Sequence, residues 1–185
     1  DELEMEDLIA DEDVVITISH SGYIKRVPMD TYKSQKRGGK GITGMTTKEE
    51  DFVEQLFITS THNYLMFFTN TGKCYRLKVY DIPETSRTAK GTAIVNLINI
   101  NNDEKITAVI SVKDFSEEKY LLAATRHGYV KKTVLSEYDS SRKDGLIAIN
   151  LEEGDELVKV VLTDGKQELI LVTAQGMSIR FSEEE

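Results

Sequence analysis

Short extended runs of apolar residues, separated by polar turns, fill most of the chain. Four pairs of these runs are alike: each has an apolar strand, a turn with a glycine, and a second strand that carries basic residues. The pairs span residues 14–27, 64–79, 121–134 and 169–181. Two extended runs joined by a tight turn are typical of a β-hairpin. The pattern therefore predicts four hairpins.

The turn glycine recurs about every 50 residues, at Gly22, Gly72, Gly128 and Gly176. Because glycine adopts positive φ without steric cost, we expect two-residue loops with primed turns. Tyr23, Tyr75 and Tyr129 lie at or just after these turns, and we interpret them as packing residues. Further runs rich in Val, Ile and Thr lie between the hairpins, at residues 52–60, 93–100, 106–112, 147–151 and 157–162, whereas only residues 3–10 look weakly helical.

About four strands in a period of about 50 residues is the make-up of a propeller blade. The predicted fold class is all-β, a β-propeller or β-pinwheel of repeated four-stranded blades, with about four repeats. A parallel βαβ fold would need helices that the pattern lacks. We place an acidic connector at residues 1–13 and a partial β-pinwheel at 14–185, with repeats near 14–60, 61–112, 115–162 and 163–185.

Charge is distributed unevenly along the chain, whose net charge is -9. Residues 1–13 hold eight acids and no base, whereas residues 22–48 hold seven bases and a single acid, Asp30. We interpret the acidic segment as a solvated connector; the alternative is a tail that competes with DNA for the basic end. The single Cys74 rules out stabilisation by a disulfide and favours a reducing cytosol, and no apolar run is long enough for a membrane span. The chain starts at Asp1 rather than Met, so we expect a piece of something longer.

The most basic segment is the loop Gln35-Lys36-Arg37-Gly38-Gly39-Lys40-Gly41, with three cations, three glycines and no acid. Glycine N–H groups can line a nest for phosphate oxygens while Lys and Arg supply charge, so the loop fits a polyanion without reading bases. A solvated basic turn is the bland alternative. Related segments at 85–91 and 140–145 follow the next two hairpins, which predicts a rim of cations around which a duplex could bend.

The predicted DNA-binding residues are those of the loop and the basic residues near it. Arg37 and Lys40 come first; alternation along a strand lets only one of Lys25 and Arg26 reach DNA. The full set is Gln35, Lys36, Arg37, Gly38, Gly39, Lys40, Gly41, Lys33, Arg26, Lys25, Arg87, Lys90, Lys131, Lys132, Arg142 and Lys143.

Catalytic and metal chemistry find little support in the sequence. The loop lacks the glycine spacing, the following Ser or Thr and the helix of a nucleotide-binding P-loop. His20, His62 and His127 are scattered, with no ligand partners at metal-binding spacing. The carboxylates Glu49, Glu50 and Asp51 give only a weak case for a glycosidase, because they lie in one polar loop. We expect no catalytic residue, metal or cofactor in this chain.

The loop at 35–41, followed by Ile42-Thr43-Gly44-Met45 and flanked by residues 11–17 and 22–26, closely resembles the C-terminal domain of the A subunit of bacterial DNA gyrase. The resemblance covers essentially the whole chain, and the seven-residue box of the family's first blade is matched at every position. It implies a six-bladed pinwheel in which neighbouring blades exchange a strand. With four repeats present, we expect a truncated version of that domain.

The resemblance also implies a function, chiral wrapping of duplex DNA that enables ATP-dependent negative supercoiling. Its partners would be double-stranded DNA, the N-terminal domain of the gyrase A subunit, and the gyrase B subunit, with ATP and Mg in the holoenzyme, in the cytoplasm at the nucleoid. The transesterifying tyrosine belongs to a preceding domain in that family. Two alternatives stay open: a topoisomerase IV type domain that selects substrates, because that relative typically has a degraded box, and a propeller that serves as a protein-binding platform.

Overall fold

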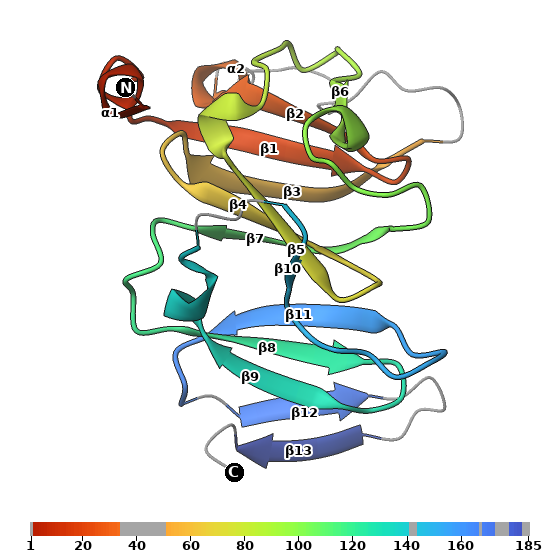
Figure 1. Cartoon of the computed structure of the whole chain (residues 1–185). Helices are drawn as coiled ribbons and strands as arrows, with labels where there is room; N and C mark the ends of the chain where they lie inside the picture. Colours follow the sequence, from red (N-terminus) through yellow and green to blue (C-terminus); the bar gives the residue numbers. More distant parts are fainter. Residues whose placement is uncertain (1, 34–50, 141–143, 167, 173–177, 183–185) are drawn as a thin grey trace.

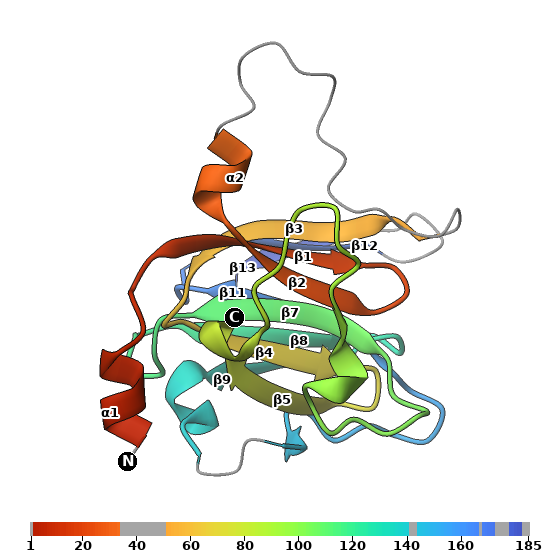
Figure 2. The same cartoon turned by 90° about the horizontal axis from the view of Figure 1, so that it is seen from above.

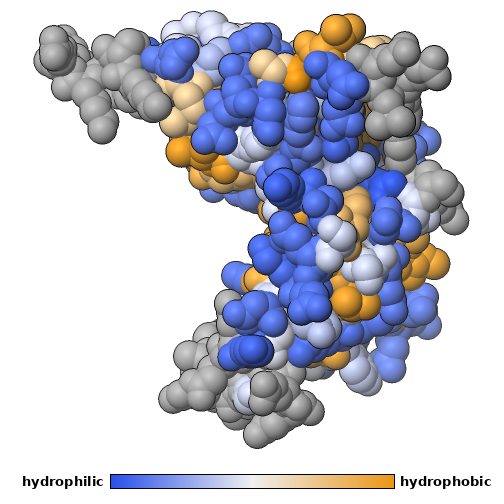
Figure 3. All heavy atoms as spheres, turned by 90° about the vertical axis from the view of Figure 1, so that its left-hand side faces the viewer, coloured by the Kyte–Doolittle hydropathy of each residue, from blue (hydrophilic) through white to orange (hydrophobic). Residues whose placement is uncertain are grey.

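The computed structural model describes residues 2–33, 51–140, 144–166, 168–172 and 178–182, and within them four antiparallel sheets stack one above another (Figure 1). The view from above looks down this stack, and the strands of the sheets overlie one another (Figure 2). From the side, the described part of the molecule is a crescent (Figure 3). The all-β fold class predicted from the sequence is confirmed.

All four predicted hairpins are present as antiparallel strand pairs. Their first strands are β1 (Asp13–Ser19), β4 (Tyr64–Thr69), β8 (Tyr120–Thr125) and β12 (Glu168–Val172). Their second strands are β2 (Tyr23–Pro28), β5 (Lys73–Lys78), β9 (Val130–Val134) and β13 (Ser178–Ser182).

The hairpin loops differ from the predicted primed turns. The N–H of Gly22 donates to the carbonyl of Ser19 at 3.0 Å, so the loop has three residues and the glycine ends it; the other two described hairpins repeat this geometry. The glycines have φ between 84° and 94°. Primed turns would need positive φ at the residue before glycine, which is costly for Ser, Thr or His, and no described non-glycine residue has it. A three-residue loop with only glycine in the left-handed region avoids that cost.

Each of the first three hairpins gains a third strand from its own repeat, and the first two also gain a fourth from the following repeat. The third strands are β3 (Val53–Ser60), β7 (Ile106–Val112) and β11 (Leu157–Thr163). The fourth are β6 (Thr92–Ala93), which pairs with β2, and β10 (Leu146–Ile147), which pairs with β5. The sheet orders are β3-β1-β2-β6, β10-β5-β4-β7 and β11-β8-β9. Strand exchange between neighbouring blades, implied by the resemblance, is confirmed.

A short helical turn follows the second strand of each of the first three hairpins. These are α2 (Met29–Lys33) and the 3-10 turns η1 (Val79–Asp81) and η3 (Leu135–Tyr138); another 3-10 turn, η2 (Ile94–Asn96), follows β6. The sequence did not reveal these, because one turn of helix leaves no periodic pattern.

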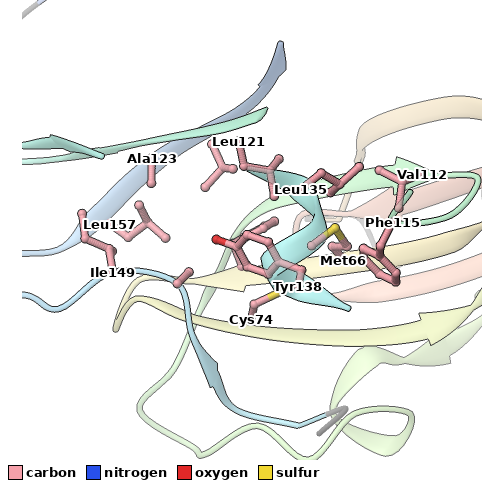
Figure 4. Close-up of a cluster of buried hydrophobic side chains, with 13 residues drawn as sticks. Met66, Cys74, Val112, Phe115, Leu121, Ala123, Leu135, Tyr138, Ile149 and Leu157 are labelled. Carbon is pink, nitrogen blue, oxygen red and sulfur yellow. The ribbon is translucent and has the colours of Figure 1, made fainter. Parts of the chain in front are cut away.

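Two hydrophobic clusters lie between the sheets and account for the strong apolar runs of the hairpins. On β4, Leu65 and Phe67 belong to the cluster shared with the first sheet, whereas Met66 and Phe68 belong to the cluster shared with the third. Successive residues of a strand point to opposite faces. A strand with a sheet on each side is therefore apolar at every position. Figure 4 shows the second cluster, in which Cys74 lies beside Tyr138 and burial raises the pKa of its thiol to about 12.

The acidic segment at the start of the chain is docked on the second blade rather than solvated throughout. It forms α1 (Glu2–Asp7), which lies beside the stack in Figure 2. The Nζ of Lys78 pairs with Glu6 at 3.1 Å, and His62 Nε2 lies 2.7 Å from the carbonyl of Ile9. Thr61 donates its hydroxyl to the carbonyl of Ala10 at 2.6 Å. Met5 and Leu8 nevertheless stay 67% and 85% exposed, so the interpretation of the segment as a solvated connector stays a prediction.

Candidate nucleic-acid interface

The predicted box loop, Gln35 to Gly41, lies outside the described residues, as do Arg142 and Lys143. Lys33 is the last residue of α2, directly before that loop. The related segment of the second repeat, residues 85–91, is described completely and shows how such a loop is held.

The 85–91 loop lies along the outer strand of the preceding blade. At its start, the N–H of Thr85 donates to the carbonyl of Arg26 on β2 at 3.0 Å. At its end, Gly91 has φ +91°, and a Cβ there would lie 2.5 Å from the carbonyl oxygen of Ile24. β6 then pairs with β2. Strand exchange therefore places cations of the second repeat at the edge of the first blade.

Lys25 is buried completely beneath this loop, and the expectation that it contacts DNA is corrected. Its Nζ donates to the carbonyls of Arg87 and Ala89, the latter at 3.2 Å. Burial, together with the charge of Arg87, lowers the pKa of Lys25 to about 8. Lys25 and Ile24 point to opposite faces of β2, yet both are fully buried, because Ile24 packs in a hydrophobic cluster while the loop from the following repeat covers Lys25.

Arg26 and Arg76 hold the loops that follow the next hairpins. The Nε of Arg26 donates to the carbonyl of Ile82 at 2.8 Å. Arg76 Nη1 donates to the carbonyl of Tyr138 at 2.9 Å, and Nη2 donates to the carbonyl of Ser140. The Arg76 guanidinium also lies 5.0 Å from the centre of the Phe115 ring. Arg76 was not among the residues predicted from the sequence, although it lies four residues after its turn glycine, as Arg26 does.

The other described candidates lie at the surface or against an aromatic ring. Lys90 is half-buried, with its Nζ 3.9 Å from the centre of the Tyr23 ring, and Arg87 is also half-buried. On β9, Lys131 and Lys132 are exposed, and the Nζ of Lys132 lies 4.5 Å from the Tyr120 ring centre. A cation against a ring face keeps its charge and its outward donors. The structure thus brings Lys25, Arg26, Arg87 and Lys90 together at the first blade, and sets Lys131 and Lys132 on the third.

A carboxylate accepts a hydrogen bond from each of the first three hairpin turns. Asp51 accepts the N–H of Ser21 at 3.0 Å, and hydrogen bonding, chiefly from the Ser21 hydroxyl, lowers its pKa to about 2. Glu104 and Asp155 hold the equivalent turns of the second and third repeats. Each of these carboxylates lies two residues before the third strand of its blade. Asp51, which the sequence offered as part of a weak glycosidase pair, therefore has a structural partner at the turn.

Strand exchange between stacked four-stranded blades defines the class: the protein is a β-propeller of the pinwheel type. The family model of the DNA gyrase C-terminal domain, described as a β-propeller, matches residues 13–60, 63–113, 119–164 and 167–185. The chain belongs to that family.

Known relatives agree with this assignment. The chain is 58% identical to the A subunit of DNA gyrase from Clostridium acetobutylicum over 182 residues, which cover 98% of the chain and 22% of that protein. It thus spans about a fifth of the length of such relatives. Among solved structures, the C-terminal domain of DNA topoisomerase IV has a TM-score of 0.80 at 35% identity, covering 95% of this chain and 53% of that one. A DNA gyrase A C-terminal domain has a TM-score of 0.69 at 26% identity, covering 92% and 55%.

Within the residues that the structure describes, no helix has the length and apolar character required to cross a membrane.

Proposed function

We propose that this chain binds duplex DNA without sequence preference and bends it around the edge formed by the outer strands and the loops that cross them. The contacts come from the box loop, Gln35 to Gly41, and from rim cations that include Arg87, Lys90, Lys131 and Lys132. Arg142 and Lys143 belong to the same set. Lysine and arginine heads on successive blades neutralise successive phosphates, so the contacts offset the elastic cost of bending.

Membership of the DNA gyrase C-terminal domain family, in a chain that carries the intact seven-residue box, is the observation that carries this proposal. The described geometry supports it, because strand exchange sets the 85–91 loop on the edge of the neighbouring blade. In the whole enzyme, this wrapping would let strand passage introduce negative supercoils. The rest of the A subunit, the B subunit, ATP and Mg would supply the cutting and the energy, in the cytoplasm at the nucleoid.

The double substitution Arg37→Ala with Lys40→Ala tests the proposal. The slope of log K against log salt should fall by about 0.9 for each phosphate that is no longer neutralised, and we expect roughly two such phosphates. Binding of a duplex of about 40 base pairs, titrated at several salt concentrations, measures it. The control is Lys105→Ala with Lys159→Ala, which removes the same charge from two exposed positions next to and within the third strands β7 and β11.

Supercoiling by the whole enzyme gives the second measurement. Negative supercoiling should fail in the Arg37→Ala, Lys40→Ala enzyme while ATP-dependent relaxation survives, because only wrapping fixes the sign of passage. An unchanged salt slope together with unchanged supercoiling would exclude the box as the anchor of the wrap.

A topoisomerase IV type role, in which the domain selects substrates, is the second candidate, favoured by the TM-score of 0.80 to that enzyme's C-terminal domain. The intact box and the 58% identity to a gyrase chain favour gyrase. Religation of a nicked circle with the domain bound separates the two, since only chiral wrapping shifts the linking number. A protein-binding platform, the third alternative, would show no measurable duplex binding.

A further inference from the structure

The 85–91 loop is attached to the first blade at both ends and supported at its centre. Its ends are fixed by backbone contacts, from Thr85 to Arg26 and through the pairing of Ile24 with Thr92. At its centre, the carbonyls of Arg87 and Ala89 accept hydrogen bonds from one ammonium, that of Lys25. This lysine comes from the preceding repeat, 62 and 64 residues away along the sequence.

Burial of this ammonium is unfavourable by itself. Lys25 has no exposed surface, and both desolvation and the charge of Arg87 disfavour its protonated form. A lysine in such a place contributes through the groups that it orients, since two carbonyls that would otherwise face an apolar strand each receive a donor. Those carbonyls belong to the backbone that carries Arg87 and flanks Lys90.

We propose that Lys25 is a positioning residue for DNA binding: its ammonium fixes the centre of the 85–91 loop on the edge of the first blade, so that Arg87 and Lys90 are presented beside the first repeat. The inference rests on the proposed function for its DNA-binding consequence, although not for the order of the loop. Lys25 itself touches no phosphate, because the loop covers it.

The third repeat offers a matched control. Lys131 lies three residues after its turn glycine, as Lys25 does, and pairs with Ala123 as Lys25 pairs with Thr17. Its side chain is exposed. Lys25→Met and Lys131→Met therefore remove the same charge from the same register position, one beneath a loop and one at the surface.

Hydrogen exchange of the free protein tests the positional part. Lys25→Met should accelerate amide exchange in peptides covering residues 85–93 by about tenfold, because the centre of the loop loses two hydrogen bonds. Lys131→Met should leave these peptides unchanged. Unchanged exchange in Lys25→Met would overturn the proposal, whatever the DNA-binding result.

Salt-dependent binding of a 40-base-pair duplex tests the functional part. Displacing Arg87 and Lys90 should lower the salt slope by about two phosphate contacts in Lys25→Met, whereas Lys131→Met should lower it by at most about one. Faster exchange with an unchanged slope would also overturn the proposal. If the unsubstituted protein binds no duplex, the proposed function fails, while exchange still decides whether Lys25 orders the loop.

Gly91→Ala provides an independent variant if Lys25→Met does not fold. It removes no charge, but its Cβ would meet the carbonyl of Ile24 at 2.5 Å and push the loop from the strand. The salt slope should again fall by about two phosphate contacts. An unchanged slope would show that loop position does not matter for binding.

Discussion

The second and third blades share one sequence pattern, but equivalent residues on their second strands have different surroundings. Tyr75 and Lys131 both lie three residues after a turn glycine, yet Tyr75 is buried and Lys131 is exposed. On β5, the exchanged strand β10 pairs with the start of the strand. On β9, β8 is the only pairing partner among the described residues.

Lys25 and Lys131 make the cause plain, because the same residue type at one register position is fully buried where a loop of the following repeat accepts its hydrogen bonds and exposed on β9. Where a later loop and strand lie on the edge, cations such as Arg76 are drawn onto backbone carbonyls. On β9, where no later strand pairs with the edge among the described residues, the cation Lys132 stays at the surface. The same position in the repeat thus holds two blades together in one case and stays at the surface in the other.

The largest expected effect comes from the turn glycines of the two blades. Gly72→Ala should cost about 3 kcal/mol or more, because positive φ is strained for alanine and its Cβ would meet the carbonyl of Ile149 at 2.5 Å. Gly128→Ala should cost about 1–2 kcal/mol, since it has the same φ strain but nothing within 4 Å. Urea unfolding of the two variants measures the difference. Equal costs would mean that the contact with the exchanged segment does not stabilise the second blade.

A smaller effect is expected at the carboxylate that holds the second turn. Glu104 accepts hydrogen bonds from Thr69, Thr71 and Tyr75 and from the N–H of Asn101 at 2.6–3.0 Å. Burial raises its pKa, but these bonds outweigh burial and hold the pKa at about 2. Glu104→Gln should destabilise the protein by about 2 kcal/mol near pH 7.

The pH dependence of this substitution gives the sharper measurement. A carboxylate whose pKa is lowered on folding stabilises the protein above its unfolded pKa, near 4.5, and this contribution is lost as pH falls to about 2. The stability difference between Glu104→Gln and the unsubstituted protein should therefore shrink across that window. The exposed Glu153→Gln serves as a control and should show no such trend. A difference that stays constant from pH 7 to pH 2 would contradict the assignment.

Much of this fold could be predicted from the sequence, because period-two runs and turn glycines are local signals. All four hairpins and the all-β class follow from them. The burial of Lys25 could not be predicted, since it depends on carbonyls of Arg87 and Ala89 in the next repeat. The helical turns after the second strands were missed because each is too short to leave a pattern.

The candidate site, too, was predictable from the sequence in part only. The box and its basic neighbours could be selected by composition, and they stay a prediction for the residues at 35–41 and 142–143. Composition could not distinguish a cation that donates to backbone carbonyls from a cation that is exposed to solvent. Arg76 and Lys132 have the same place in the repeat and both lie near an aromatic ring, but Arg76 also donates to a carbonyl of the following repeat, whereas Lys132 is exposed. That contact between repeats could not be seen in the sequence.

The smallest expected effects come from two of the three tyrosines that were assigned to packing from the sequence. The assignment is confirmed for Tyr75, which is 3% exposed and donates to Glu104 at 2.7 Å, and wrong for Tyr129, which is 54% exposed. Tyr75→Phe should cost about 1 kcal/mol, because Glu104 loses one donor in a buried place. Tyr129→Phe should leave the urea midpoint unchanged, because water replaces its bond to Glu152. A larger loss for Tyr129→Phe would show that the edge of the third blade is covered, as that of the second is.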